Sequence, residues 1–182
     1  MEFIERSGEC HRVADPSWQD PLSGAYSMRF GGRWNAPGSF PVVYLNADIP
    51  TARANARRHL TEQLRGYPYG AQDLDPSELP VLVSTDLPQH DYLDIVTDGG
   101  IDGVGLPVTY PKDSHGDPIP HEPCREIGQH AWDAGLFGIA CRSAATTAPP
   151  NGEEVAWFDR HEEELKVKKT RSFAEWYGDF DW

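Results

Sequence analysis

The stretch from Gly31 to Leu60, GGRWNAPGSFPVVYLNADIPTARANARRHL, decides the fold because it reads as a turn, a strand and a helix in immediate succession. Its two leading glycines allow a tight turn that carries Arg33. The apolar run PVVYLN predicts a short buried strand. A helix then begins after Asp48, which can cap it, with Pro50 suited to its first turn and Gly66 suited to its end.

This predicted helix, residues 50–65, turns an asparagine toward its buried side. Its apolar stripe has four-residue spacing and consists of Ala52, Ala56, Leu60 and Leu64. Asn55 and His59 lie along the edge of that stripe, and His59 reads as a satisfied core histidine. A buried amide without partners costs about 1–3 kcal/mol, so Asn55 is expected to meet a polar group. Either the backbone of a neighbouring loop or a functional pocket satisfies this expectation.

The rest of the chain predicts an α+β fold. β-rich runs bounded by turn residues predict further strands at residues 10–14, 79–87, 137–143 and 154–159. A second helix is expected at residues 123–135. The aromatic tail, residues 171–182, is expected to dock as a helix, with a partner-binding strip as the alternative. Segments rich in Pro, Gly and Asp, residues 14–27 and 105–123, read as loops. We expect a single domain over residues 1–182.

Composition excludes several classes of function. A formal net charge of −13 argues against direct binding of nucleic acid, and it disfavours anionic ligands unless arginines locally reverse the field in a cleft. No apolar run approaches the roughly 18–20 residues of a membrane-spanning helix, and the N-terminus does not read as a signal peptide. Three scattered cysteines, Cys10, Cys124 and Cys141, suggest neither disulfides nor a zinc site. These features predict a cytoplasmic protein without membrane contact.

Two motifs that suggest a cofactor fail on spacing. His115, Asp117 and His121 lie in a proline-rich loop, and their spacing matches no dedicated metal motif. The glycines of GGIDGVG, residues 99–105, do not follow the dinucleotide fingerprint. No metal is expected.

Three side chains are candidates for binding a ligand. Arg33 on its glycine turn offers a planar fork of donors that suits a phosphate, although a solvated arginine in a plain turn fits the same residues. Tyr44 ends an apolar run and reads either as core or as a ring that stacks on a flat ligand. Ser143, at a strand end, lacks the context of a nucleophile and is expected to form hydrogen bonds.

Taken together, residues 12–55, 125–132, 138–144 and 153–159 resemble the RES-domain family of bacterial toxins. The GGRWNAPG segment is the most specific part of this likeness. The resemblance implies an ADP-ribosyltransferase-like split β-sheet core with flanking helices. It also implies a toxin that destroys NAD as its substrate and pairs with an Xre-type antitoxin. A basic, DNA-binding antitoxin would complement this acidic chain.

The same resemblance assigns roles to site residues. Arg33 matches the family's catalytic arginine and would hold the NAD diphosphate; Tyr44 would stack near the nicotinamide and Ser143 would orient the substrate. Asn55 stands where the family's helix carries a glutamate. A carboxylate stabilises the positive charge that builds on the ribose, and losing such a group costs about 3–4 kcal/mol, so slower or altered catalysis is expected.

Three explanations for Asn55 stay open: altered chemistry in a natural subfamily, a degenerate member that binds without turnover, or an engineered substitution. Glu62 lies about 10 Å further along the helix, too far to replace it, and the sequence does not place Glu153 or Glu154. We expect an NAD glycohydrolase or phosphorylase. The alternative is a catalytically silent module that binds an antitoxin-like partner or a nucleotide; whether copies of the chain associate as a homo-oligomer also stays open.

Overall fold

The computed structural model describes residues 1–66, 73–145, 147–160 and 164–177. Within these residues the chain forms six strands: β1 (Phe3–Ala14), β2 (Val42–Asn46), β3 (Val81–Ile95), β4 (Gly138–Arg142), β5 (Glu153–Phe158) and β6 (Lys169–Arg171). It also forms five helices: α1 (Ala25–Phe30), α2 (Ile49–Gln63), α3 (Asp98–Gly103), α4 (His121–Asp133) and α5 (Phe173–Tyr177). The predicted α+β class is confirmed.

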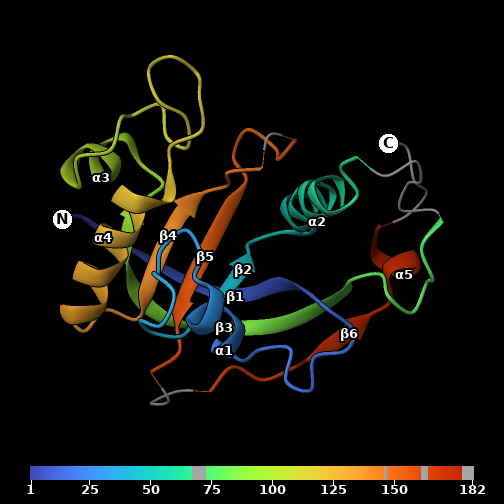
Figure 1. Cartoon of the computed structure of the whole chain (residues 1–182). Coiled ribbons are helices and arrows are strands. Elements are labelled where there is room, and N and C mark those ends of the chain that lie inside the picture. Colours follow the sequence, from blue (N-terminus) through green and yellow to red (C-terminus); the bar gives the residue numbers. More distant parts are fainter. Residues whose placement is uncertain (67–72, 146, 161–163, 178–182) are drawn as a thin grey trace.

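The strands pair in a circuit rather than in an open row. β1 pairs with β2, β2 with β5, β5 with β4, β4 with β3, and β3 returns to pair with β1, while β6 joins the other side of β3. Only the β3–β4 pairing is parallel among the pairings of the described strands. The circuit places β5, from late in the chain, between β2 and β4 (Figure 1).

Apolar side chains fill both sides of the central strands. Val42 of β2 packs in one cluster with Phe158 and Trp34, whereas Val43, one residue later, packs in a second cluster with Trp157. Because successive side chains of a strand point to opposite faces, two buried faces require the nearly continuous apolar run that the sequence shows here.

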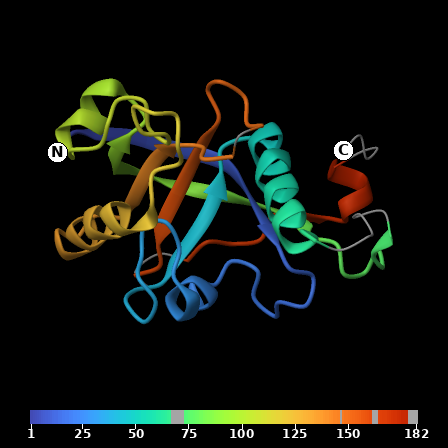
Figure 2. The ribbon, with the colours of Figure 1, turned by 45° about the horizontal axis from the view of Figure 1, so that its top comes forward.

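Four of the helices lie at the two ends of the sheet and leave β2, β4 and β5 between them, whereas α1 lies next to β2 (Figure 1). Figures 1 and 2 both show α3 and α4 at one end of the molecule and α2 and α5 at the other. Arg53 of α2 donates hydrogen bonds from Nε (2.9 Å) and Nη2 (2.7 Å) to the backbone oxygen of Trp176, which fastens α5 to α2. No helix among the described residues is long and apolar enough to cross a membrane.

The predicted elements are found, with differences at their ends. Asp48 caps α2 through a 2.6 Å hydrogen bond from the Thr51 backbone N–H, and the stripe of Ala52, Ala56 and Leu60 is buried. Within the C-terminal tail, Phe173–Tyr177 is a docked helix, as predicted, whereas residues 178–182 lie outside the described residues. The interpretation of His59 as a core residue is wrong, because its side chain is exposed.

Candidate active site

The Gly-Gly-Arg-Trp-Asn loop between α1 and β2 folds back on itself. Gly31 ends α1 with a φ of 76°, a conformation that favours glycine, and its N–H bonds to the Ser27 carbonyl at 2.7 Å. The N–H of Gly32 donates to the Asn35 carbonyl at 2.9 Å and closes the turn. Arg33, at the tip, donates from Nη1 to the backbone oxygen of Ile119 at 3.2 Å. The guanidinium thus reaches the chain just before α4.

Tyr44 holds this loop in place through its hydroxyl. The hydroxyl accepts a hydrogen bond from the Trp34 N–H at 3.0 Å and donates one to Asn35 Oδ1 at 2.9 Å. Gly32 lies so close that an added Cβ would be 2.3 Å from the hydroxyl oxygen. Burial raises the pKa of Tyr44, so the phenol stays protonated and able to donate. Strand β2 therefore fixes the loop that carries Arg33.

Helix α4 braces the loop from the other side. Arg125 donates from Nε to the Gly32 carbonyl oxygen at 3.0 Å. Gly128 packs directly on the Trp34 carbonyl, where an added Cβ would lie 1.7 Å from the oxygen. Cys124 of α4 lies beside the Arg33 side chain. Burial acts to lower the pKa of Arg33, but Tyr110, Cys124 and Cys141 act in the other direction and the net shift is upward, so the guanidinium stays charged.

Removing the Tyr44 hydroxyl is expected to destabilise the protein. Tyr44→Phe leaves the Trp34 N–H and the buried Asn35 amide oxygen without this partner. The free energy of unfolding should fall by about 1–3 kcal/mol, the cost of leaving buried polar groups unsatisfied, as measured by urea denaturation. Tyr26→Phe is the control, because Tyr26 is 53% exposed. Equal stability of the two variants would contradict this role.

The strand register brings a set of polar side chains onto one face of the sheet. In β5, Glu154 lies opposite Asn46 of β2 and opposite Cys141 of β4. Since side chains two residues apart share a face, Tyr44 lies on the face of Asn46, and Ser143 continues the face of Cys141. Glu153 points to the opposite face, where its Oε2 accepts a 2.9 Å hydrogen bond from Arg6 Nη2.

Asn55 of α2 faces this set and completes a directional network. Its Nδ2 donates to Asn46 Oδ1 at 2.8 Å and to Glu154 Oε1 at 2.9 Å. Asn46 in turn donates from Nδ2 to the His11 carbonyl at 3.0 Å, which leaves its Oδ1 as the acceptor. The Ser143 hydroxyl donates to the same Glu154 oxygen at 2.6 Å. The partners of Asn55 are thus side chains, so the interpretation of a cap on a loop backbone is wrong.

A cavity of about 190 Å³ opens beside this network. Arg33 and Ser143 line it, together with Lys112 and short apolar residues of the segments that follow α3 and β4. Both segments project from the same side of the molecule (Figure 1). Tyr44, Asn55 and Glu154 are outside the lining. The structure therefore brings Arg33 and Ser143 to one cavity and places Tyr44 and Asn55 in the layer that supports them.

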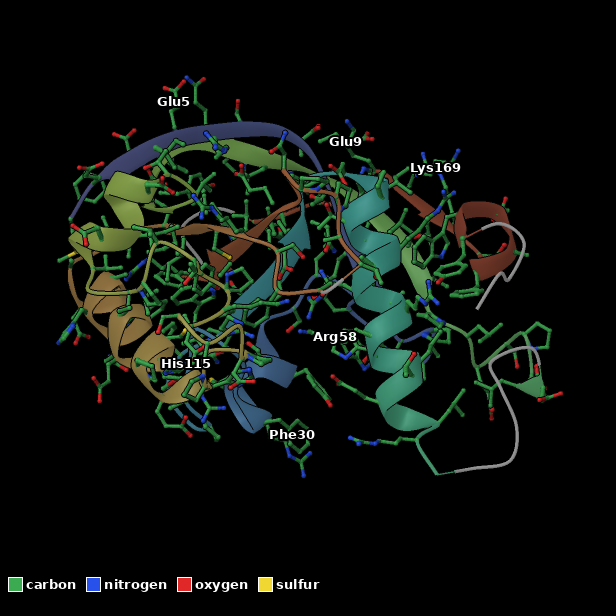
Figure 3. The ribbon with its side chains drawn as sticks, turned by 90° about the horizontal axis from the view of Figure 1, so that it is seen from above. Glu5, Glu9, Phe30, Arg58, His115 and Lys169 are labelled. Carbon is green, nitrogen blue, oxygen red and sulfur yellow. The ribbon has the colours of Figure 1, made fainter. Side chains whose placement is uncertain are left out.

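Three arginines act together on the start of α4, near the cavity. Partial burial lowers the pKa of His121, at the start of α4, and three guanidinium groups lower it further: Arg33, Arg125 and Arg58. They come from the loop, α4 and α2, respectively, and Figure 3 shows Arg58 on the flank of α2 that faces the α4 end of the molecule. Arg58 Nε is buried and has no hydrogen-bond partner among the described residues. A phosphate-bearing ligand suits such a cluster.

Two features of the site are not predicted from the sequence. Asn46 is not among the candidates, and Glu154 is named without a position in the fold. The signal for Glu154 was an acidic residue at the start of a β-rich run, which becomes informative only with the strand register. No group of three or more metal-ligating side chains lies together in the described part of the chain.

The chain has relatives among known proteins. The RES domain family model matches residues 9–179, and the chain belongs to this family. It is 31% identical over 148 residues to the NAD(+) phosphorylase MbcT of Mycobacterium tuberculosis and to that of Mycobacterium bovis, covering 78% of this chain and 70% of each relative. The crystal structure of the M. tuberculosis MbcT–MbcA toxin–antitoxin complex matches its fold. The TM-score is 0.73, with 23% identity over 97% of this chain and 92% of the other.

Proposed function

We propose that the protein cleaves the bond between nicotinamide and ribose in NAD(+), with inorganic phosphate as the acceptor. The observation that carries this proposal is the convergence of Arg33 and Ser143 on one cavity in a RES-family chain. The likeness to an NAD(+) phosphorylase supports phosphate over water as the acceptor.

The shape and charge of the cavity suit one end of NAD. Its volume of about 190 Å³ is below the roughly 300–1,000 Å³ of sites that enclose a drug-sized ligand. We therefore place the nicotinamide riboside inside and the rest of the dinucleotide across the rim. Arg33 then grips the diphosphate through its planar fork, and Arg58 and Arg125 add positive charge nearby.

The reaction depends on electrostatic stabilisation of the charge on the ribose more than on a nucleophile supplied by the protein. The C1′–nitrogen bond breaks, and its electron pair leaves with nicotinamide, which becomes neutral. Positive charge moves to C1′ and the ring oxygen until a phosphate oxygen forms the new bond to C1′. Hydrogen phosphate supplies a lone pair without first losing a proton. We assign Ser143 to the orientation of the ribose and Tyr44 to the support of the Arg33 loop.

Purified protein is expected to release nicotinamide from NAD, and faster with inorganic phosphate than without it. The test follows NAD loss and nicotinamide release by chromatography, and phosphorus NMR identifies an ADP-ribose phosphate ester. Equal rates in both buffers, with free ADP-ribose as the product, would indicate a glycohydrolase instead. Intact NAD under all conditions would favour the alternative, a silent binding module.

We also propose a protein partner, an Xre-type antitoxin that covers the cavity in the cytoplasm. The solved structure with the same fold is a toxin–antitoxin complex. A net charge of −13 complements a basic, DNA-binding partner. Helix α1, next to the Arg33 loop, exposes Tyr26, Met28 and Phe30, and Figure 3 shows Phe30 at the outer edge of the molecule. The cysteines, free and buried, fit a reducing compartment.

A further inference from the structure

Glu154 occupies the centre of the polar network next to the cavity. Its Oε1 accepts hydrogen bonds from Ser143 Oγ at 2.6 Å, from Asn55 Nδ2 at 2.9 Å and from the Ala144 N–H at 3.3 Å. Two of these donors, Ser143 and Ala144, line the cavity. Every hydrogen bond that Glu154 accepts from the described residues reaches Oε1, so the geometry leaves Oε2 for a ligand. Glu154 itself is not a lining residue, but its carboxylate lies directly behind Ser143 and Ala144 and is held there by three hydrogen bonds.

The donors and acceptors around Glu154 fit a carboxylate at position 154 and an amide at position 55. Asn46 presents its Oδ1 to Asn55, because its own Nδ2 donates to the His11 carbonyl. Asn55 therefore faces two acceptors, Asn46 Oδ1 and Glu154 Oε1, and its Nδ2 supplies both hydrogens. A carboxylate at position 55 would face both oxygens without a proton to share, and like charges in contact disfavour ionisation. Asn55 and Glu154 are thus complementary as a pair.

The position of Glu154 also fits the charge that the proposed reaction creates. Cleavage leaves positive charge on the ribose, and a fixed carboxylate in a site shielded from water stabilises such charge. Burial and Cys141 raise the pKa values of the neighbouring Tyr44 and Tyr110, and Glu154 adds a smaller contribution in the same direction. Glu153 next to it is turned to the opposite face and paired with Arg6, so it does not serve this role.

We propose that Glu154 is the carboxylate of the active site, the group that stabilises the positively charged ribose when the nicotinamide bond breaks. This inference rests on the proposed function. Asn55 is its positioning residue: the amide orients Glu154 instead of acting on the substrate. The carboxylate that the helix lacks is provided from strand β5, so an asparagine at position 55 is compatible with full activity.

The test compares nicotinamide release by the wild type, Glu154→Gln and the exchanged variant Asn55→Glu/Glu154→Gln. Glutamine keeps an oxygen that accepts from Ser143 and Asn55 but removes the charge. We expect kcat to fall by about 100- to 1,000-fold in Glu154→Gln, with KM for NAD changed by less than about threefold. The exchanged variant moves the charge back to the helix, where the new amide at position 154 can donate to it while Asn46 Oδ1 stays an unfavourable neighbour. It should therefore recover at least tenfold but remain below the wild-type rate. A residue that merely supports the structure would not produce this pattern.

Glu153→Gln is the matched control, because it removes the adjacent carboxylate on the opposite face and should leave kcat near that of the wild type. Circular dichroism shows whether each variant folds. If Glu154→Gln does not fold, the exchanged variant decides: turnover supports the proposal and silence overturns it. Activity of folded Glu154→Gln within about threefold of the wild type, or a loss that the exchange does not restore, overturns the role of Glu154 alone. A wild type that leaves NAD intact overturns the proposed function and this inference with it.

Discussion

Arg33→Ala is expected to lower kcat/KM for NAD by about 100- to 1,000-fold, the usual effect of removing one well-placed charged group from an active site. Arg33 is the one guanidinium that lines the cavity among the described residues, and the Tyr44 hydroxyl and α4 hold its loop on two sides. Nicotinamide release at several NAD concentrations measures the change. Fluorescence titration should show weaker NAD binding as well, because the diphosphate loses its partner.

Two further variants test whether the effect depends on the planar shape of the guanidinium and on its position in the molecule. Arg33→Lys keeps the charge but loses the planar fork, so it should recover only part of the activity. Arg29→Ala removes an exposed arginine of α1 that lies over the Phe30 ring, 4.9 Å from its centroid, and it should leave turnover unchanged. If Arg33→Ala and Arg29→Ala are equally active, Arg33 does not bind the substrate.

Gly128→Ala is expected to destabilise the protein by about 3 kcal/mol, at the upper end of the usual cost of overpacking. The added Cβ would lie 1.7 Å from the Trp34 carbonyl oxygen, a backbone atom that no side-chain rotation moves. For a chain of this size, such a loss lowers the melting temperature by about 6–12 °C. Because α4 must then move away from the Arg33 loop, NAD turnover should fall together with stability.

Gly103→Ala provides the comparison for this experiment. Gly103 is also helical, but a Cβ there meets no atom within 4 Å. Its melting temperature, followed by calorimetry, should stay within about 2 °C of the wild type, as for most surface substitutions. A melting temperature of Gly128→Ala equal to that of Gly103→Ala would show that α4 does not pack tightly on the loop.

The sequence predicts the elements best where local chemistry decides them. Asp48 and the alanine stripe determine α2, and the apolar run ending in Tyr44 determines β2. The same reasoning misses α1 and α3, six residues each, which are too short for a clear periodic pattern. It also underestimates β1 and β3. The exposed first half of β1 is stabilised by pairing with β3 rather than by burial, whereas the last residues of β3, 92–95, are buried, and residues 93–95 also pair with β4.

For the active site, the sequence supplies the candidates but not the connections between them. Asn55 was expected to meet a polar group, and it does. The identity of that group depends on the register that sets Glu154 opposite Asn46, and no local pattern encodes a pairing between strands so far apart. The pairing of the Asn55 amide with the Glu154 carboxylate can therefore be recognised only from the three-dimensional structure.

The position of β5 between β2 and β4 has a consequence for the biosynthesis of the protein. Asn55 and Glu154 are 99 residues apart, a length that a ribosome makes in roughly 5–20 s at about 5–20 residues per second. Until β5 emerges, β2 and β4 lack the strand between them, and Ser143 lacks the carboxylate that it binds. The proposed NAD-consuming site therefore forms only after β5 has been translated, and a polypeptide that terminates before β5 leaves the NAD of its own cell untouched.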